Sequence, residues 1–381
     1  MKKILFINGH LNAGGCERSL TDLLRNINFQ EYDVDLLLLE DLGDYLEEIP
    51  NGVNVIFYPL GRAFGSFGHC MLNAIKKKDW FSFWYRLIHL YSTKFGVKKI
   101  KHARRLFPKV KKHYDTIIAY RPGICTDLAA FAFSADKKIS WWHHGEFYDF
   151  GDLLTPYEVI DHIVAVSESS AEIVKSYYPS VADKVTVISN IVRIYALMEK
   201  SEYYQIDKTD KLTLVTIGRF SPEKNMIICP EIGKKLSEYK IDFLWYLIGD
   251  GVQLEETKKL IAQFELEDRF VFTGRINNPY PYLKAADILV HPSLVESQGL
   301  TVLEAMALET PVVVVKSAGP KEYIENGING YLVDADCEQI ADIIMNISQD
   351  KEMAEDLVHN AKDIVKEFSP EVIINKLQKL L

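Results

Sequence analysis

The chain has 381 residues, and at roughly 150 residues per domain this length predicts two or three domains. Hydrophobic residues make up 48% and charged residues 25%, a composition that excludes a disordered or collagen-like chain. The 44 Lys and Arg residues against 53 Asp and Glu residues give a net charge of −9, which argues against a general nucleic-acid-binding protein.

The cysteines and the N-terminus indicate the compartment. The five cysteines are scattered without any Cys-x-x-Cys pair, so we expect a reducing environment and neither a disulfide framework nor a zinc site. The apolar run that starts at Ile4 is too short for a signal peptide, and no run approaches the ~18 residues of a membrane span. We therefore predict a cytoplasmic protein.

Short apolar runs alternate with longer helical patterns along the chain. Strands are predicted over residues 4–8, 34–39, 53–58, 116–120, 138–142, 163–167, 185–189, 212–218, 242–249, 270–273, 288–291, 311–315 and 330–333. Helices predicted between them include residues 19–28, 169–178, 253–264 and 301–308. Continuous apolar strands joined by helices predict an α/β fold with parallel sheets and right-handed crossovers.

The alternation breaks in a polar, charged stretch over residues 190–211, and a new strand–loop–helix unit starts at Leu212. We therefore predict two doubly wound domains of similar size, over residues 1–190 and 191–365. An apolar-periodic helix follows within a separate C-terminal segment, residues 366–381.

The loop after the first predicted strand carries Gly14 and Gly15, and a helix follows it. Glycines at this place let main-chain N–H groups approach an anion at the helix N-terminus. The segment is neither a P-loop nor a dinucleotide fingerprint, because it lacks both the Lys-Ser/Thr pair and a G-x-G-x-x-G pattern. A tight strand–helix turn without a ligand is the alternative.

The second half opens in the same way, with Arg219 and Lys224 in the loop after the strand over residues 212–218. The two cations can converge on one diphosphate, the guanidinium as a fork and the ammonium as a point charge. A solvated turn is the alternative. The loops over residues 249–251 and 273–275 also follow strands, and ligands of open α/β sheets bind at such carboxyl ends.

Residues 291–306 combine a strand end, an irregular loop with Glu296, and a helix with Glu304 on its second turn. Glu304 suits a ribose diol because a carboxylate accepts two hydroxyl bonds, and Glu296 then faces the reacting sugar. By spacing alone, two glutamates in a helix-entry region are usually capping or solvated groups. A phosphate can bind the free N–H groups at the helix start, those of Gly299, Leu300 and Thr301.

In combination these segments resemble the retaining glycosyltransferases of family 4, which have the GT-B fold and include enzymes of bacterial cell-surface polysaccharide and glycolipid assembly. The likeness covers nearly the whole chain and is strongest over residues 212–333. The motifs that carry it are Gly14-Gly15-x-Glu17-Arg18, Gly218-Arg219-x4-Lys224, Gly249-Asp250-Gly251, Glu296-x7-Glu304, Gly319-Pro320-Lys321-Glu322 and Gly327-Ile328-Asn329-Gly330.

The resemblance implies two Rossmann-like domains that face each other across a cleft. It implies a nucleotide-sugar donor on the C-terminal domain, an acceptor on the N-terminal domain, and a C-terminal helix that returns to the N-terminal domain. It further implies transfer with retention, with no metal and no cofactor besides the donor, which we expect to be a UDP-sugar.

Individual roles also follow from the resemblance. Arg219 and Lys224 correspond to the diphosphate ligands, Glu304 to the ribose ligand, and Glu296 to the carboxylate near the donor sugar. The family's mid-domain histidine near the donor-sugar hydroxyls corresponds to His143, with His144 as the alternative and a core histidine as the structural explanation for either. The predicted donor site further includes the loop residues Gly14, Gly15, Gly249, Gly251, Arg275, Gly299, Leu300 and Thr301.

Two details bear on these expectations. The Asp-x-Asp patterns over residues 33–35 and 334–336 lie at a strand entry and before a helix, so we interpret both as structural and assign no metal. Gln298 stands where the family commonly has an aromatic residue. Its amide can change the contacts with the sugar hydroxyls, so the identity of the donor sugar is left open.

Residues 76–112 hold 13 Lys and Arg residues, a single acid and many aromatic residues. Interfacial helices have this composition, so we predict an anionic membrane surface as a partner. Packing within the domain, an anionic acceptor, or RNA stacking are the alternatives, and we expect no nucleic acid.

The predicted function is sugar transfer to a saccharide or lipid-linked acceptor at the inner face of the plasma membrane. A non-catalytic GT-B partner or a sugar-nucleotide epimerase is the alternative.

Overall fold

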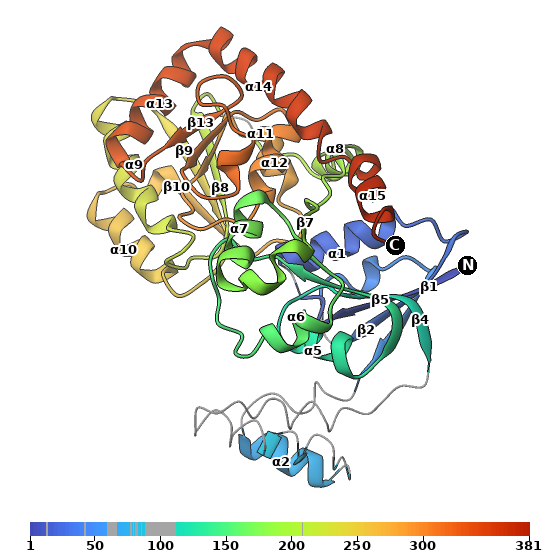
Figure 1. The fold of residues 1–381 in the computed structure, drawn as a ribbon. Coiled ribbons are helices and arrows are strands. Elements are labelled where there is room, and N and C mark those ends of the chain that lie inside the picture. Colours follow the sequence, from blue (N-terminus) through green and yellow to red (C-terminus); the bar gives the residue numbers. More distant parts are fainter. Residues whose placement is uncertain are drawn as a thin grey trace. The chain divides into compact units, whose positions relative to one another are not determined.

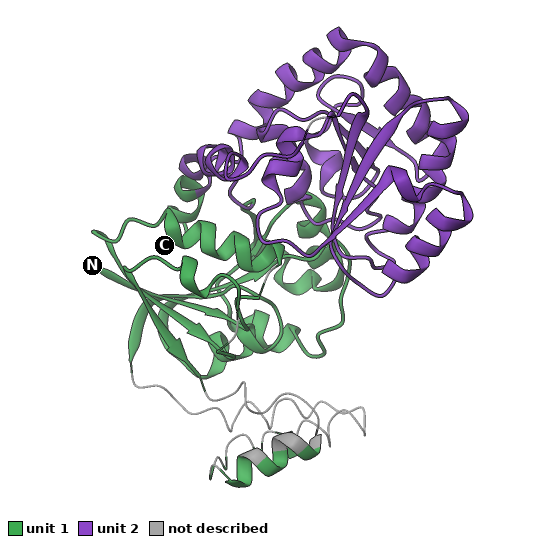
Figure 2. Cartoon of the chain, turned by 180° about the vertical axis from the view of Figure 1, so that it is seen from behind, with its two compact units in different colours: residues 1–189, 374–381 green, residues 190–373 purple. Residues whose placement is uncertain are grey.

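The computed structural model describes residues 1–12, 14–41, 43–58, 67–76, 78, 80, 83, 84, 86, 87, 112–207 and 209–381. These residues form two compact units (Figure 2). Unit 1 comprises Met1–Ser189 and Ile374–Leu381, and unit 2 comprises Asn190–Ile373.

Unit 1 contains a parallel sheet whose described strands have the order β3-β2-β1-β4-β5-β6-β7 (Figure 1). The strands are β1 (Lys2–Asn8), β2 (Tyr32–Leu38), β3 (Val53–Phe57), β4 (His113–Ala119), β5 (Ser134–Trp142), β6 (His162–Ala165) and β7 (Val185–Val187). The helices are α1 (Gly15–Arg25), α2 (Phe67–Lys76), α5 (Ile124–Phe131), α6 (Leu154–Val159) and α7 (Glu168–Tyr177). One face of the sheet packs on α5, α6 and α7 through a continuous apolar core.

Unit 2 contains a second parallel sheet, with the order β10-β9-β8-β11-β12-β13. The strands are β8 (Leu212–Ile217), β9 (Phe243–Ile248), β10 (Phe270–Gly274), β11 (Ile288–His291), β12 (Val312–Val315) and β13 (Tyr331–Val333). The helices are α8 (Ile194–Ser201), α9 (Cys229–Glu238), α10 (Leu254–Gln263), α11 (Tyr280–Ala285), α12 (Leu300–Ala307), α13 (Cys337–Gln349) and α14 (Lys351–Lys366), and α15 (Pro370–Gln378) begins here and ends in unit 1.

Helices cover both faces of the unit 2 sheet, which explains why β11 and β12 are apolar throughout and fully buried. One core joins the sheet to α9, α10 and α13, and the other joins it to α8, α11, α12 and α14. The predicted α/β fold is therefore confirmed, with a strand at each of the thirteen predicted places. One helix differs: α1 begins at Gly15 and not at residue 19, because Gly14 is already its extended N-cap residue.

The strand order reverses at one place in each sheet. β1 lies between β2 and β4 in unit 1, and β8 lies between β9 and β11 in unit 2. Ligands of open α/β sheets bind at the carboxyl ends of the strands beside such a reversal. The loops after β8 and β11 carry Lys224 and Glu296, so these two candidate residues of unit 2 lie where such sheets bind ligands.

Most of the basic, aromatic segment 76–112 lies outside the described residues. Within the described part of the chain, no helix is both long enough and apolar enough to span a membrane. Four of the five cysteines, Cys16, Cys125, Cys229 and Cys337, are free thiols.

The last residues of the chain contact unit 1. The ammonium of Lys2 donates a hydrogen bond to the carbonyl oxygen of Leu381 at 3.0 Å, and that of Lys137 donates to Leu380 at 2.6 Å. Ile373 and Leu377 of α15 are buried. The C-terminal segment thus contacts β1 and β5 of unit 1, in agreement with the helix return that the family resemblance implies.

Candidate functional site

Three predicted loops of unit 2 lie side by side at the carboxyl ends of β8, β9 and β10. The main-chain N–H of Phe220 donates to Asp250 at 3.0 Å, and that of Gly249 donates to Gly274 at 3.0 Å. Gly249 has φ of +144°, and a Cβ atom there would lie 1.8 Å from the carbonyl oxygen of Gly218. Glycine is therefore required where these loops meet, and main-chain hydrogen bonds join the three loops.

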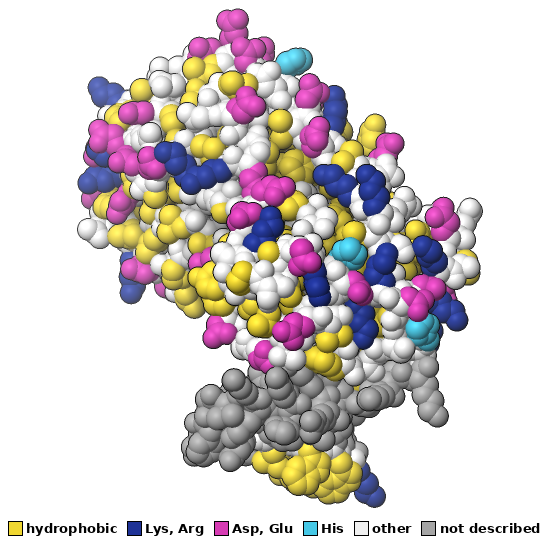
Figure 3. Space-filling view, viewed as in Figure 1, with side chains coloured by type: hydrophobic (Ala, Val, Ile, Leu, Met, Phe, Trp, Pro, Cys, Tyr) yellow, Lys and Arg dark blue, Asp and Glu magenta, His cyan; other side chains and the backbone are white. Residues whose placement is uncertain are grey.

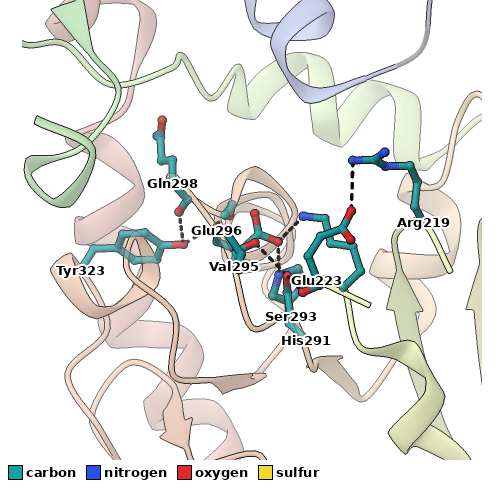
Figure 4. Close-up of polar contacts among 10 residues, drawn as sticks. Arg219, Glu223, His291, Ser293, Val295, Glu296, Gln298 and Tyr323 are labelled. Carbon is teal, nitrogen blue, oxygen red and sulfur yellow. Dashed lines mark hydrogen bonds and ion pairs between the residues drawn. The ribbon is translucent and has the colours of Figure 1, made fainter. Parts of the chain in front are cut away.

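Glu296 lies at the centre of the side-chain cluster after β11 (Figure 4). Its Oε1 accepts a hydrogen bond from Lys224 Nζ at 2.6 Å and another from His291 Nε2 at 2.8 Å. The side chain of Glu296 is 11% exposed and that of His291 is 4% exposed. The structure thus joins the loop after β8 to the loop after β11 through a buried carboxylate.

The charge state of Glu296 follows from its neighbours. Burial would raise the pKa of this carboxyl, but the Lys224 charge and the hydrogen bond from His291 outweigh burial and lower the pKa to about 2. Glu296 is therefore a carboxylate at neutral pH. The alternative of a solvated glutamate is wrong, because most of the side chain is covered.

Arg219 takes a different position from Lys224. It is 75% exposed, and its guanidinium pairs with Glu223 Oε1 at 3.5 Å (Figure 4). The pKa of Glu223 is lowered because hydrogen bonds from the local backbone and from Ser221, followed by the Arg219 and Lys224 charges, outweigh its burial. The two cations therefore lie on either side of Glu223 on one loop, but each has its own carboxylate partner.

The start of α12 is built without a capping side chain. Gly299 is its N-cap residue, with φ of +78°, and as a glycine it supplies no side-chain cap to the first N–H groups of the helix, which include those of Leu300 and Thr301. Tyr323 Oη donates to the carbonyl oxygen of Gln298 at 2.9 Å and holds the turn in place. Glu296 does not cap this helix with its Oε1, which accepts from Lys224 and His291.

Glu304 lies on the second turn of α12 and is 4% exposed. Tyr280 Oη lies 3.5 Å from its Oε1. Arg275, by contrast, is exposed just beyond the end of β10. Glu304, the residue predicted to bind the ribose, is thus held in position by its helix and by the neighbouring Tyr280 hydroxyl.

Gln298 does not behave as the sequence suggested. Its Oε1 accepts from the main-chain N–H of Asn190 at 2.8 Å, and its Nε2 donates to the carbonyl oxygen of Asn190 at 3.3 Å. The side chain is 2% exposed and is directed away from Glu296 in Figure 4. Because both amide atoms are bonded to the backbone, the expected contact of Gln298 with a sugar hydroxyl is not supported.

Unit 1 has its own polar cluster at the carboxyl ends of β1, β4 and β5. Glu17 on α1 is 2% exposed, and its Oε1 pairs with the guanidinium of Arg121 at 2.9 Å. A Cβ atom at Gly14 would lie 2.4 Å from Glu17 Oε2, so the glycine makes room for this carboxylate. Gly14 therefore accommodates the buried Glu17 carboxylate, and the ion pair of Glu17 with the partly exposed Arg121 is one that the sequence did not indicate.

His143 and His144 follow β5 beside this pair. Nε2 of His143 is buried and has no hydrogen-bond partner among the described residues. Burial, aided by His144 and Arg121, holds the pKa of His143 well below its ordinary value. Burial and the Arg121 charge also lower the pKa of His144 to about 4. Both imidazoles are thus neutral at pH 7 and can exchange hydrogen bonds with a neutral hydroxyl.

The Asp-x-Asp patterns are structural, as interpreted from the sequence. Asp35 is buried in β2 and accepts a hydrogen bond from Tyr114 Oη at 2.6 Å. Asp336 caps α13 by accepting from the main-chain N–H of Gln339 at 2.8 Å. Among the residues that the structure describes, no group of three His, Cys, Asp or Glu side chains is placed to hold a metal ion.

Two solved structures share this architecture over essentially the full chain. Anabaena HepE in complex with UDP and glucose is 19% identical with a TM-score of 0.72, over 100% of this chain and 99% of that one. A Staphylococcus aureus TarM variant in complex with fondaparinux, alpha-GlcNAc-glycerol and UDP is 15% identical with a TM-score of 0.72, over the same shares. The two parallel sheets and these likenesses define the class as the GT-B fold.

Sequence comparisons show similarity between unit 2 and known glycosyltransferases. Residues 199–364 match the family model described as glycosyl transferases group 1. The lipopolysaccharide core biosynthesis glycosyltransferase LpsE of Rhizobium meliloti is 30% identical over 200 residues, which are 52% of this chain and 58% of that protein. An uncharacterized glycosyltransferase of Haemophilus influenzae is 25% identical over 348 residues, 89% of this chain and 87% of that protein. The matched part of unit 2 is therefore similar to the glycosyl transferases of group 1.

Sequence reasoning missed three residues of these clusters. His291 is the polar last residue of an apolar strand and Arg121 is a polar residue just after one, and this position is the signal that could have selected them. Tyr323 carries no such signal, because its contact with the start of α12 depends on the tertiary fold.

Proposed function

We propose that the chain is a retaining glycosyltransferase that moves a sugar from a nucleotide-diphosphate sugar, preferentially a UDP-sugar, to a saccharide or lipid-linked saccharide acceptor. The main support is the ionised, buried Glu296 beside Lys224, placed where the unit 2 sheet reverses and within the segment that matches group 1. The bound UDP in the HepE and TarM structures supports the choice of nucleotide.

The donor diphosphate is assigned to Lys224, Arg219 and the free N–H groups at the start of α12. Departure of the leaving group increases negative charge on the diphosphate, and fixed cations and amides stabilise that charge without a metal. Arg219 is exposed and free to turn toward a phosphate, while Lys224 must exchange part of its contact with Glu296 for one with the ligand.

The remaining donor contacts are assigned by position. Glu304 accepts the ribose hydroxyls, and Glu296 receives the donor sugar. The loops with Gly249, Gly251 and Arg275 border this site at the ends of β9 and β10. His143 supplies a neutral imidazole to a sugar hydroxyl, a role that its buried, unpartnered Nε2 supports.

We further propose that the protein works at an anionic membrane surface through residues 76–112. Several large apolar side chains in and beside this segment are exposed, namely Leu72, Ile75, Trp80 and Trp84. Figure 3 draws apolar side chains together over α2 with a basic residue beside them. Rings and cations in this combination suit the headgroup region of a bilayer.

The transfer activity is tested by release of nucleoside diphosphate from UDP-, GDP- and ADP-sugars, with and without membrane extract as the acceptor source. We expect the highest release from a UDP-sugar. Lys224→Ala and Glu296→Ala each lower it by at least ~100-fold, the scale of one lost contact to a developing charge.

The matched controls are Lys351→Ala and Glu355→Ala, which remove an exposed ion pair on α14 and should leave turnover unchanged. Turnover like that of the wild type in both site variants would overturn the assignment of the site. Absence of release from every nucleotide-sugar would overturn the proposed function.

A further inference from the structure

His291 is the last residue of β11 and is almost fully buried. Its Nε2 lies 2.8 Å from Glu296 Oε1. Because an ionised carboxylate only accepts hydrogen bonds, Nε2 carries the hydrogen and donates it. The imidazole therefore donates a hydrogen bond to Glu296. Its Nδ1 has no hydrogen-bond partner in the described part of the chain.

The two oxygens of Glu296 have different surroundings. Oε1 accepts from both Lys224 and His291, whereas Oε2 makes no hydrogen bond with any described residue. The side chain retains 11% exposure. Oε2 is thus the oxygen that remains for a bound molecule, and its direction is set by the two donors on Oε1.

These two donors differ in how firmly they are held. Lys224 ends a flexible four-carbon stem, and a diphosphate carries more negative charge than Glu296 and competes for the ammonium. His291 is rigid by comparison, because β11 is paired with β8 on one side and β12 on the other. When a ligand draws Lys224 away, the bond from His291 remains.

We propose that His291 is a positioning residue for transfer, which holds Glu296 through Oε1 so that Oε2 keeps its direction toward the donor sugar. This inference rests on the proposed function of the site. His291 itself is assigned no contact with the substrate.

The test compares His291→Leu, which removes the donor group, with His291→Gln, which can place an N–H near the same position. We expect kcat of the Leu variant to fall about 100-fold, the effect of misplacing a reacting group by about 1 Å. Donor KM and UDP affinity should change less than about 3-fold, because the diphosphate contacts remain. The Gln variant should recover most of kcat, and His359→Leu on the exposed side of α14 is the control.

Equal losses of kcat in the Leu and Gln variants, or a wild-type kcat in the Leu variant, would overturn the positioning role. If the wild type transfers no sugar, the proposed function fails, and the contact itself is judged by thermal unfolding of His291→Leu, Glu296→Gln and the double variant. Coupled groups give non-additive shifts of Tm. Additive shifts would then overturn the inference independently of activity.

Discussion

Glu296 shows how a buried carboxylate is kept ionised in unit 2. A carboxylate in a covered position loses hydration, which alone would favour its protonated form. Lys224 and His291 supply two hydrogen bonds to one oxygen, and Lys224 adds a full positive charge at 2.6 Å. The outcome is a fixed negative group that can accept hydrogen bonds from the hydroxyl groups of a sugar.

The lowered pKa makes a prediction about stability. A carboxyl whose pKa falls from 4.5 to about 2 on folding stabilises the native state above pH 4.5, and this contribution is lost as pH falls from 4.5 toward 2. Glu296→Gln removes a stabilisation of up to about 3 kcal/mol at pH 7. The difference in Tm between wild type and variant should be constant from pH 7 to 5.5 and should shrink below about pH 4.5.

Glu355→Gln, at an exposed position on α14, provides the control and should show a small, constant difference in Tm. A Tm difference for Glu296→Gln that does not shrink down to pH 3.5 would contradict the ionised, paired state of this carboxylate.

The sequence predicted which residue types lie in the unit 2 loops, but not their pairing. Lys224 and Glu296 are 72 positions apart, and both were assigned to the donor separately. Their contact depends on the adjacent placement of β8 and β11, which strand periodicity does not reveal. The contact of His291 with Glu296 could not be predicted for the same reason, since it depends on the fold of the loop after β11.

At the level of elements, Gln298 connects the loop before α12 to the first residue of unit 2. Its amide forms a two-bond pair with the main chain of Asn190, which is itself 6% exposed. Replacing the amide by an aromatic ring would remove both bonds from buried backbone groups, which costs about 1–3 kcal/mol per group left unsatisfied.

We therefore expect Gln298→Phe to lower Tm by several degrees without changing which nucleotide-sugar is preferred. Gln263→Ala, at an exposed position in α10, is the matched control for loss of a glutamine. Thermal scanning together with the donor screen makes the comparison. A switch in sugar preference with unchanged Tm would show that Gln298 contacts the donor after all.

The elements themselves were predictable because both sheets are parallel and buried. Strands such as β12 are apolar at every position, so they stand out from the amphipathic helices around them. The start of α1 was less predictable, because Gly14 and Gly15 suggest a loop while the structure uses the first as a helix N-cap and the second as the first helical residue. Close approach at this loop was predicted correctly for Gly14, but the group that lies against Gly14 is the Glu17 carboxylate.

At the level of the whole molecule, the net charge of −9 hides an uneven distribution. Residues 76–112 carry 13 basic residues and one acid, so the remainder holds 31 basic and 52 acidic residues, and the two parts have charges of +12 and −21. Each Lys or Arg near an anionic bilayer contributes about 1 kcal/mol, and salt screens this attraction.

We expect the protein to sediment with anionic vesicles and not with neutral ones at low salt, and to be released at high salt. The double variant Trp80→Ala/Trp84→Ala should lower the bound fraction, because it removes two exposed rings. Tyr195→Ala, at a 90% exposed position in α8 of unit 2, is the control. Equal binding to anionic and neutral vesicles at low salt would contradict the membrane proposal.

Unit 1 is discontinuous, and this has a consequence for synthesis. Residues 374–381, which complete unit 1, are made only after the 184 residues of Asn190–Ile373. At about 5–20 residues per second, the ribosome needs roughly 10–40 seconds for that interval. During this time β1 and β5 of the nascent chain lack the segment that contacts them, so unit 1 reaches its final packing after unit 2 has been translated, although it is the first to emerge.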